Sequence, residues 1–393
     1  MKSKENSQFS TRHSPSVPPG YKQTEVGVIP EDWEVKPLAF VVKYTNGKAH
    51  EQSITDSGNF VVVNSKFIST EGIIRKFAQM RFCPAEKGDV LMVMSDVPNG
   101  RAIAKCFWVD CEDTYTVNQR ICVLNPCGID GKLLYYKLDR NPFYLTFDDG
   151  AKQTNLRKED VLSCPLSIPN TEAEQRAIAA ALSDVDALLD GLDRLIAKKR
   201  DLKQAAMQQL LTGQTRLPGF KGEWEIKRLG DVLMVRHGKS QRGISVSDGK
   251  YPILASGGEI GRTNTCIYDK PSVLIGRKGT IDSPQYVDSP FWTVDTLFFT
   301  EISTEANAKF IFSKFSIIPW RTYNEASGVP SLNAKTIENI EIFLPSPTEQ
   351  TAIAQVLSDM DAEIAALEQR RNKTRDIKQA MMQELLTGKT RLV

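Results

Sequence analysis

Apolar residues follow two different periods along this chain, and the two periods alternate. Over two long stretches they recur at alternating steps of four and three residues, the spacing of one face of a paired helix. The first stripe is Ile178, Leu182, Val185, Leu189, Leu192 and Ile196, and the second is Ile353, Leu357, Met360, Ile364 and Leu367. Elsewhere short β-branched and aromatic runs such as "FVVVNS", "DVLMVMS", "SVLIGR" and "DTLFFTEI" are broken by Gly, Pro and Asn. These runs predict strands and turns.

The ends of both helices are marked in the sequence. Each begins with a hydroxyl residue followed three positions later by glutamate, Thr171 with Glu174 and Ser346 with Glu349, which is the pattern of a capping box. Each is expected to end at a glycine, Gly213 or Gly388, because glycine tolerates the left-handed conformation that closes a helix. A helix between such marks spans about 60 Å at about 1.5 Å per residue.

Charge along the helices predicts how they pair. Residues 172–193 hold six acids and one base, whereas 194–216 hold six bases and one acid; in the second stretch 349–369 hold five acids and no base, and 370–391 hold seven bases and two acids. An antiparallel pair sets each acidic half against a basic half, whereas a parallel pair stacks acid on acid. A simpler explanation, that each helix complements its own dipole, stays open beside this one.

The chain is an internal repeat. Residues 173–217 align without gaps to 348–392 with 26 of 45 positions identical. Upstream of each helix the matched strands keep their order, but the offset between copies falls from 191 to 175, so the first copy carries about 16 more residues in its loops. Similar ends with diverged middles are what a shared scaffold with two different recognition surfaces predicts, although neutral drift in loops would look the same.

These patterns predict an α+β protein with two mixed α/β domains alternating with two long helices that pair as an antiparallel coiled coil. The predicted parts are a disordered tail (1–20), a first domain (21–170), a first helix (171–213), a second domain (214–345) and a second helix (346–393). The central phrase "LLTGQTRLPGFKGEWEIKRLG" recurs split between the two ends, as "LLTGKTRLV" and "QTEVGVIPEDWEVKPL". We therefore expect a pseudo-twofold, circularly organised repeat whose ends lie close together.

Composition excludes several classes of protein. No apolar run is long enough to cross a bilayer, and the polar first 20 residues lack the apolar centre of a signal peptide, so a cytoplasmic protein is expected. The seven cysteines form no C-x-x-C pair and there are three histidines, which disfavours zinc and predicts reduced, buried thiols. A net charge of +2 gives by itself no reason to expect nucleic acid as a partner.

No motif for catalysis is complete. "GKS" at 238–240 lacks the upstream glycine of a phosphate-binding loop. "NPFY" at 141–144 departs from the Asn-Pro-Pro-Tyr/Phe motif of amino-methyltransferases. "PEDWEVK" at 30–36 has the acids and lysine of a nuclease signature, but it matches "KGEWEIK" at the same repeat boundary, which favours a structural role. The sequence predicts a chain that binds and positions something and has no catalytic residue.

Two divergent domains, each opened by "WE.K.L", and two helices running from "EQ.AIA..LSD.DA" to "LLTG.TRL" closely resemble the specificity subunit of a type I restriction-modification system, across residues 21–393. The resemblance implies that each domain is a target recognition domain reading one half of a split DNA site. It implies that the helices act as a spacer and dock two modification (methyltransferase) subunits. It implies no cofactor in this chain, S-adenosylmethionine in the methyltransferase partners, and ATP and Mg²⁺ in the restriction (translocase) partners.

Base reading needs amide and guanidinium groups, and phosphate contact needs Lys or Arg. Candidates at loop positions in the first copy are Asn46, Lys48, Lys66, Asn99, Arg101, Asn118, Gln119, Arg120, Lys152, Gln153 and Asn155. Those in the second copy are His237, Lys239, Gln241, Arg242, Arg262, Asn264, Arg277, Lys278, Asn324 and Asn333. Gly47-Lys48 and Gly238-Lys239 occur in both copies, which favours a shared backbone contact that positions DNA. Two other hypotheses stay open: a coiled-coil scaffold that binds proteins and not DNA, and a self-contained methyltransferase or nuclease.

Overall fold

The computed structural model describes residues 17–97 and 100–392, so the predicted tail lies almost wholly outside the described residues. The chain divides into two compact units. Unit 1 contains the residues up to Asp190 and those from Asn372 onward, and unit 2 is Gly191–Arg371. Both units have the mixed α/β content that the sequence predicts; the predicted domain boundaries at 170/171 and 345/346 stay predictions.

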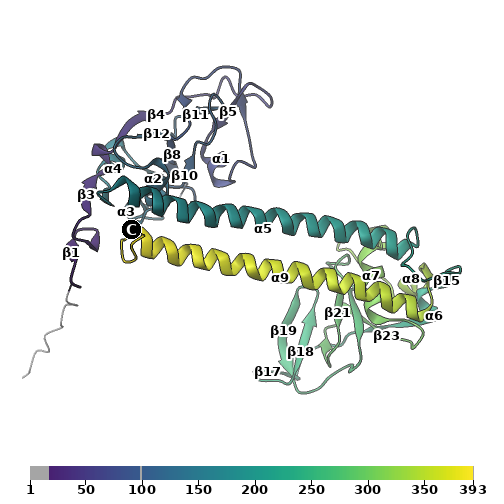
Figure 1. Cartoon of the computed structure of the whole chain (residues 1–393). Coiled ribbons are helices and arrows are strands. Elements are labelled where there is room, and N and C mark those ends of the chain that lie inside the picture. The colour runs from purple at the N-terminus through teal and green to yellow at the C-terminus, as the bar shows by residue number, and fades with distance from the viewer. Residues whose placement is uncertain (1–16, 98–99, 393) are drawn as a thin grey trace, which may run out of the picture. The chain divides into compact units, whose positions relative to one another are not determined.

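Unit 1 is built on two four-stranded sheets (Figure 1). The first has the antiparallel order β10 (Cys106–Trp108), β8 (Val90–Val93), β12 (Ile121–Pro126), β4 (Val42–Asn46). The second has the order β6 (Phe77–Ala78), β5 (Phe60–Val63), β11 (Tyr115–Val117), β7 (Pro84–Ala85), with β5 and β11 parallel. Every residue of β8 is buried, which explains why "DVLMV" reads as a continuous apolar run and not as an alternation.

Short elements complete unit 1. Two-stranded sheets are formed by β1 (Tyr21–Thr24) with β2 (Gly27–Pro30), by β3 (Glu34–Pro37) with β14 (Pro165–Ile168), and by β9 (Ser95–Asp96) with β13 (Thr154–Asn155). The short helices are η1 (Leu38–Phe40), α1 (Ser65–Ser69), α2 (Gly131–Leu138), α3 (Pro142–Leu145) and α4 (Lys158–Leu162).

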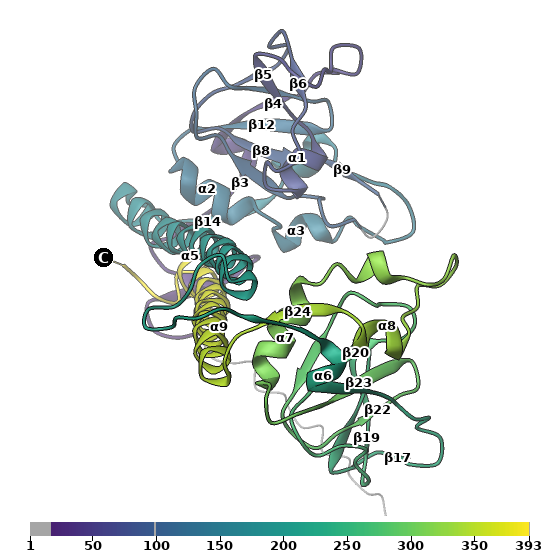
Figure 2. The same ribbon diagram turned by 90° about the vertical axis from the view of Figure 1, so that its right-hand side faces the viewer.

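Unit 2 likewise has two four-stranded sheets (Figure 2). Its first sheet has the order β16 (Leu233–His237), β23 (Leu297–Ile302), β20 (Ser272–Gly276), β21 (Gln285–Val287), and its second has β17 (Ser245–Val246), β19 (Gly258–Thr263), β18 (Tyr251–Ala255), β22 (Trp292–Thr293). The strands β18 and β22 are parallel, as are β5 and β11. The other elements are β15 (Glu225–Arg228) paired with β24 (Glu341–Leu344), and α6 (Leu229–Val232), α7 (Ala308–Ile317), η2 (Trp320–Tyr323) and α8 (Ala334–Glu338).

The two long helices are α5 (Glu172–Thr212) and α9 (Pro347–Leu385). Within unit 2 the ion pairs Asp193–Arg371, Lys199–Glu363 and Lys203–Asp361 join them, and within unit 1 Asp186 pairs with Lys378. In unit 2 the residue number of the α9 partner falls from 371 to 361 as that of the α5 partner rises from 193 to 203, so the contacting helix segments run antiparallel there. None of the predicted seam residues is exposed: Ile178, Leu182, Leu192, Ile196, Ile353, Leu357 and Ile364 are buried, and Val185, Leu189, Met360 and Leu367 are half-buried.

The predicted capping boxes are only half formed. The Thr171 hydroxyl accepts from the Glu174 N–H at 3.3 Å, and the Ser346 hydroxyl accepts from the Glu349 N–H at 3.4 Å. Neither glutamate reaches back to its cap residue. Both carboxylates instead accept hydrogen bonds from a tryptophan and an arginine distant in sequence.

Those contacts build one cluster in each unit. The terminal cluster of unit 1 is Trp33, Lys137, Glu174, Gly388 and Arg391. The Trp33 Nε1–H donates to Glu174 at 3.3 Å, Arg391 binds Glu174 and Asp32, and Lys137 donates to the Leu386 carbonyl at 2.8 Å. Two cations lie near the indole, with the Lys137 ammonium 5.1 Å and the Arg391 guanidinium 6.0 Å from its ring centroid.

The central cluster of unit 2 is Trp224, Lys314, Glu349, Gly213 and Arg216. Trp224 donates to Glu349 at 3.2 Å, both bonds of Arg216 to that carboxylate are 2.6 Å, and Lys314 donates to the Leu211 carbonyl at 2.5 Å. In both clusters the glycine has positive φ, 72° at Gly388 and 75° at Gly213, as the predicted helix ends require.

The terminal cluster joins sequence near the two ends of the chain (Figure 1). The Tyr21 hydroxyl donates to the Gly388 carbonyl at 3.1 Å, and two bonds of 2.9 Å join Arg391 to Asp32. The two parts of the split phrase are therefore in contact, as the repeat predicted. In the central cluster the corresponding residues belong to one continuous segment, 213–224.

The prediction that the cysteines are buried is wrong for two of the seven. All seven are free thiols; Cys83, Cys106, Cys122 and Cys164 are buried and Cys266 is half-buried, but Cys111 and Cys127 are exposed. Both exposed thiols lie outside the strands: Cys127 directly follows β12, and Cys111 lies three residues after β10.

Candidate nucleic-acid interface

The Gly-Lys pair shared by both units packs against the turn that follows the parallel strand. In unit 1 the Gly47 N–H donates to the Ile121 carbonyl and the Lys48 N–H to that of Val117, both at 2.9 Å. In unit 2 Gly238 and Lys239 bond in the same way to Leu297 at 3.0 Å and Thr293 at 2.9 Å. A Cβ at Gly47 or Gly238 would lie 2.0 Å from a carbonyl oxygen of that turn, so only glycine allows the approach. Both lysine side chains are exposed.

Four candidates of unit 1 line one pocket beside this turn. Its volume is about 260 Å³, and Gln119, Arg120, Gln153 and Asn155 line it together with Ser95. The Ser95 hydroxyl donates to Asn155 Oδ1 at 2.7 Å and accepts from Gln153 Nε2 at 2.7 Å. Three amides and a guanidinium at one surface can present both donors and acceptors to a base edge.

The other unit 1 candidates are more scattered. Asn46 at the end of β4 accepts from the Tyr44 hydroxyl at 2.6 Å. Asn118 is only 7% exposed, and its side-chain oxygen accepts from the Arg120 N–H at 3.4 Å, so its side chain supports the turn. Lys66 in α1, Arg101 and Lys152 are exposed. Asn99 lies outside the described residues.

In unit 2 a group of basic candidates surrounds the corresponding turn, 294–296. The Arg277 N–H donates to the Thr296 carbonyl at 2.8 Å and its Nη1 to the Asp295 carbonyl at 3.3 Å. The backbone of Lys278 forms an isolated antiparallel β-bridge with that of Ser331. His237, at the end of β16, packs its ring edge-on against Phe298 with centroids 4.9 Å apart. With Lys239, these side chains provide cationic and ring nitrogens at one edge of the sheet.

Several unit 2 candidates have their polar groups engaged within the chain. The Arg262 guanidinium donates to the carbonyls of Gly249 and Lys250 and to Glu259. Asn264 accepts from the Lys250 N–H, Asn324 bonds Ala326 and Ser331, and Asn333 caps α8 by accepting from the Lys335 N–H. These side chains shape the loops, and a DNA role for them remains a prediction.

The neighbouring candidates Gln241 and Arg242 differ from these in their surroundings. Among the described atoms, the Gln241 side-chain oxygen is buried without a hydrogen-bond partner. Arg242 next to it is exposed.

Sequence reasoning missed residues that position the candidates. The Trp292 Nε1–H donates to the Lys239 carbonyl at 2.9 Å. His50 is 1% exposed and bonds both the Lys48 carbonyl and the Thr116 hydroxyl. Sequence reasoning also missed Lys137 and Lys314, which belong to the terminal and central clusters. They align at an offset of 177, the same offset that matches the preceding strands, so a search for lysines retained in both copies would have found them.

A comparison with known families decides what this architecture is. Residues 30–198 and 221–374 match the type I restriction modification DNA specificity domain, so the chain contains two copies, each lying mostly in one unit, and the matches cover most of the chain. The chain belongs to this family. Its members supply DNA sequence specificity to type I restriction-modification systems, and this chain is a specificity subunit of that kind.

Individual relatives match the specificity subunit over nearly its whole length. The type I restriction enzyme MjaX and MjaVIII specificity subunits of Methanocaldococcus jannaschii are 25% and 24% identical. The alignments cover 95% and 93% of this chain, and 97% and 94% of the two relatives.

Solved structures share the fold. The S subunit from M. genitalium superposes with a TM-score of 0.64 at 18% identity, covering 90% of this chain and 96% of that one. A second structure, described in terms of complex assembly and conformational transition of the type I R-M system, gives a TM-score of 0.57 at 17% identity, covering 92% and 99%.

In the described part of the specificity subunit, no helix combines the length and the apolar character that spanning a membrane requires.

Proposed function

We propose that each unit of this specificity subunit reads one half of a bipartite, asymmetric DNA site. The observation that carries the proposal is the shared edge: in both units a Gly-Lys pair is fixed against the same turn by two backbone hydrogen bonds, while the side chains around that turn differ. Unit 1 has the amides Gln119, Gln153 and Asn155 there, and unit 2 has Arg277 and Lys278. A common backbone contact with different base-reading groups suits two unlike half-sites.

The long helices act as the spacer between the two half-sites, pair as an antiparallel coiled coil and dock two methyltransferase subunits. The ion pairs from Asp193–Arg371 to Lys203–Asp361 support the pairing in unit 2, and Asp186–Lys378 supports it in unit 1. The chain itself performs no catalysis. S-adenosylmethionine belongs to the methyltransferase partners, and ATP and Mg²⁺ to the restriction partners. Because the net charge is only +2, those partners supply much of the attraction to phosphate.

Exchanging residues 228–344 for the same region of a relative tests the division of labour. Methylome sequencing of cells carrying the whole system should show one half of the methylated site changed and the other half intact. A change in both halves would refute modular reading. If the assembled complex showed no salt-sensitive, sequence-dependent DNA binding at all, the protein-binding scaffold would replace this proposal.

Lengthening one helix tests the spacer role. Inserting a whole heptad after Gly191, in both α5 and the matching place in α9, keeps the apolar seam in register. The gap between half-sites should lengthen or assembly should fail. Unchanged spacing with full methylation would show that the helices do not measure the gap.

A further inference from the structure

The helices α2 and α7 occupy equivalent positions in the two units. Their N-cap residues, Asp130 and Asn307, each donate a backbone N–H at 2.8 Å to a glutamine of the adjoining long helix, Gln175 or Gln350. From these caps onward the two helices align at an offset of 177. Position 136 in α2 therefore corresponds to position 313 in α7, where tyrosine is replaced by serine.

In unit 1 the Tyr136 ring fills the space between α2 and the paired long helices. It is 2% exposed. Its hydroxyl donates to Asp186 at 2.7 Å and lies 3.2 Å from the Ser183 hydroxyl. The Lys378 ammonium lies 5.6 Å from the ring centroid and 2.6 Å from Asp186. The phenol of Tyr136 is thus in contact with a carboxylate, a hydroxyl and a cation.

Unit 2 keeps these three groups but lacks the ring. At the helix offset of 175, Ser183, Asp186 and Lys378 correspond to Ser358, Asp361 and Lys203. Lys203 and Asp361 are again paired, at 2.5 Å. The Ser313 hydroxyl donates along its own helix to the Lys309 carbonyl at 2.9 Å.

A pocket of about 490 Å³, the Ser313 pocket, lies at this place. Its polar lining includes Lys203, Ser358 and Asp361, and its apolar wall includes Met207, Phe312 and Leu357.

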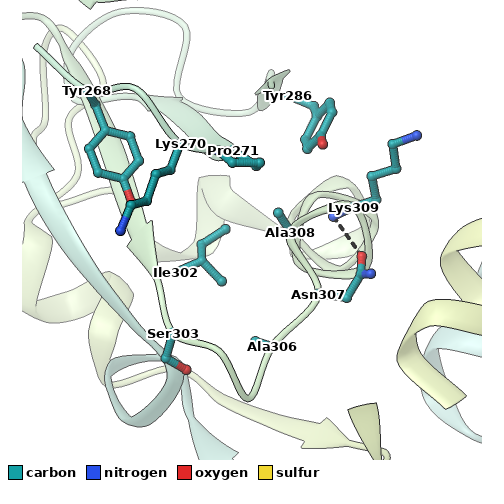
Figure 3. Close-up of a pocket in the computed structure, with 10 residues that line it drawn as sticks. All are labelled: Tyr268, Lys270, Pro271, Tyr286, Ile302, Ser303, Ala306, Asn307, Ala308 and Lys309. Atoms are coloured by element: carbon teal, nitrogen blue, oxygen red, sulfur yellow. Dashed lines mark hydrogen bonds between the residues drawn. The ribbon is translucent and has the colours of Figure 1, made fainter. Parts of the chain in front are cut away.

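The remaining wall is aromatic and cationic. Tyr286 and Phe312 pack with ring centroids 5.9 Å apart, and the Lys309 ammonium lies 5.9 Å from the Tyr286 ring. Figure 3 shows Tyr286 and Lys309 near the start of α7, where Asn307 caps the helix; there they also border a neighbouring pocket of about 450 Å³. Unit 1 has a lysine on an aromatic ring at the same place, with Lys132 5.0 Å from Trp108.

We propose that the Ser313 pocket binds a para-substituted phenol, the group that a tyrosine side chain carries, in the manner in which unit 1 holds its own Tyr136. The phenol hydroxyl donates to Asp361, and the ring lies between Lys203 and the apolar wall. A charge-assisted bond of this kind selects a phenol over a plain ring. The phenol is supplied either by a tyrosine of a partner subunit, a source that rests on the proposed function, or by a free phenolic compound.

Titrating the full-length chain with 4-methylphenol tests the pocket, with binding followed by NMR. Toluene, which has the same ring and methyl group without the hydroxyl, is the control ligand and requires no variant. We expect saturable binding of 4-methylphenol at least tenfold tighter than that of toluene. Equal binding of the two, or no binding of 4-methylphenol, would overturn the proposal.

Two variants locate the site. Ser313→Tyr fills the pocket from within and should abolish 4-methylphenol binding, whereas Ser313→Ala leaves it open and should preserve binding. Binding that persists in a folded Ser313→Tyr chain would also overturn the proposal.

Assembly of Ser313→Tyr with the methyltransferase subunits distinguishes the sources. Weakened assembly identifies a partner tyrosine, and unchanged assembly with lost 4-methylphenol binding identifies a free phenol. The 4-methylphenol titration involves no DNA, so a failure of the proposed DNA reading would be seen separately, in methylome sequencing of the wild-type system.

Discussion

Arg391 holds the terminal cluster together, and replacing it with methionine should destabilise this part of unit 1. Its guanidinium makes two bonds of 2.9 Å to Asp32 and also binds both oxygens of Glu174, one of them at 2.8 Å. The Glu174 side chain is 1% exposed. These two carboxylates raise the pKa of Arg391, and Arg391 in turn lowers that of Asp32. Methionine keeps most of the aliphatic stem and removes the charge.

The stability lost in Arg391→Met depends on the contacts that Glu174 and Asp32 keep without the guanidinium. Leaving one partner of a buried ion pair uncompensated costs about 3–5 kcal/mol. The loss here is smaller, because the Arg391 side chain is 30% exposed and Trp33 still donates to Glu174. The exposed Asp32 bonds add only about 0–1 kcal/mol. We therefore expect a loss of about 2–3 kcal/mol, or about 30- to 150-fold in the opening equilibrium, since about 1.36 kcal/mol corresponds to tenfold.

Hydrogen exchange is the suitable assay, because a chain of two units need not unfold in one step. Amides of residues 21–37 should exchange about 30- to 150-fold faster in Arg391→Met, provided that they exchange by local opening of the cluster. Arg216→Met is the matched variant in the central cluster and should act on residues 216–228 instead. Arg200→Met, whose side chain is 62% exposed beside Glu368, should change neither region by more than about 0.5 kcal/mol. Exchange of residues 21–37 within threefold of wild type in Arg391→Met would refute the assigned role.

Three further predictions concern single residues. Burial lowers the pKa of Lys137 to about 7, against about 10.4 in an unfolded chain; the penalty on the folded state is complete below pH 7 and fades as the pH rises toward 10.4. Unit 1 should therefore gain stability between pH 7 and 10, and the difference between wild type and Lys137→Met, measured by urea unfolding, should depend on pH; a constant difference would contradict this assignment. Gly238→Ala places a Cβ 2.0 Å from the Val294 carbonyl and should cost at least about 2 kcal/mol, as overpacking does, whereas Gly257→Ala, with open space around the position, should be nearly neutral in the same unfolding experiment. Lys239→Ala should weaken DNA binding by the assembled complex equally for matched and altered half-sites and reduce the salt slope by about one; a change in half-site preference would instead make Lys239 a base-reading residue.

The helices and strands were predictable because their signals are local. The stripe from Ile178 to Ile196 needs only the period of a helix, and the buried β8 needs only its apolar run. The predicted helix 171–213 is Glu172–Thr212 in the structure, and the second ends at Leu385, before Gly388. The capping-box prediction failed because a glutamate side chain can accept either from a nearby backbone N–H or from side chains distant in sequence. Glu174 fits a capping box in sequence, but its carboxylate lies beside Trp33 and Arg391, and a charged donor in a buried site is stronger than a single backbone N–H.

At the candidate interface, too, residue types were predictable from the sequence but their contacts were not. Amide and basic residues could be selected by type and by their place beside matched strands, yet Arg262 and Asn333 have the same types and are engaged in holding loops. Gln119, Gln153 and Asn155 gather around one pocket because β9 pairs with β13 and places residue 155 beside residue 95. No local pattern encodes that pairing.

By itself, the sequence determined the repeat, the alternation of domains and helices, the opposed charges of the helix halves, and the resemblance that the family match confirmed. These follow from periodicity and identity along the chain. Only the tertiary structure decided which side chains share a site: Glu174 with Arg391, which are 217 residues apart, and Tyr136 with Asp186 and Lys378. The physical reason is that a buried carboxylate, ammonium or phenol takes the partner that folding places within hydrogen-bond reach, and distance along the chain carries no information about that reach.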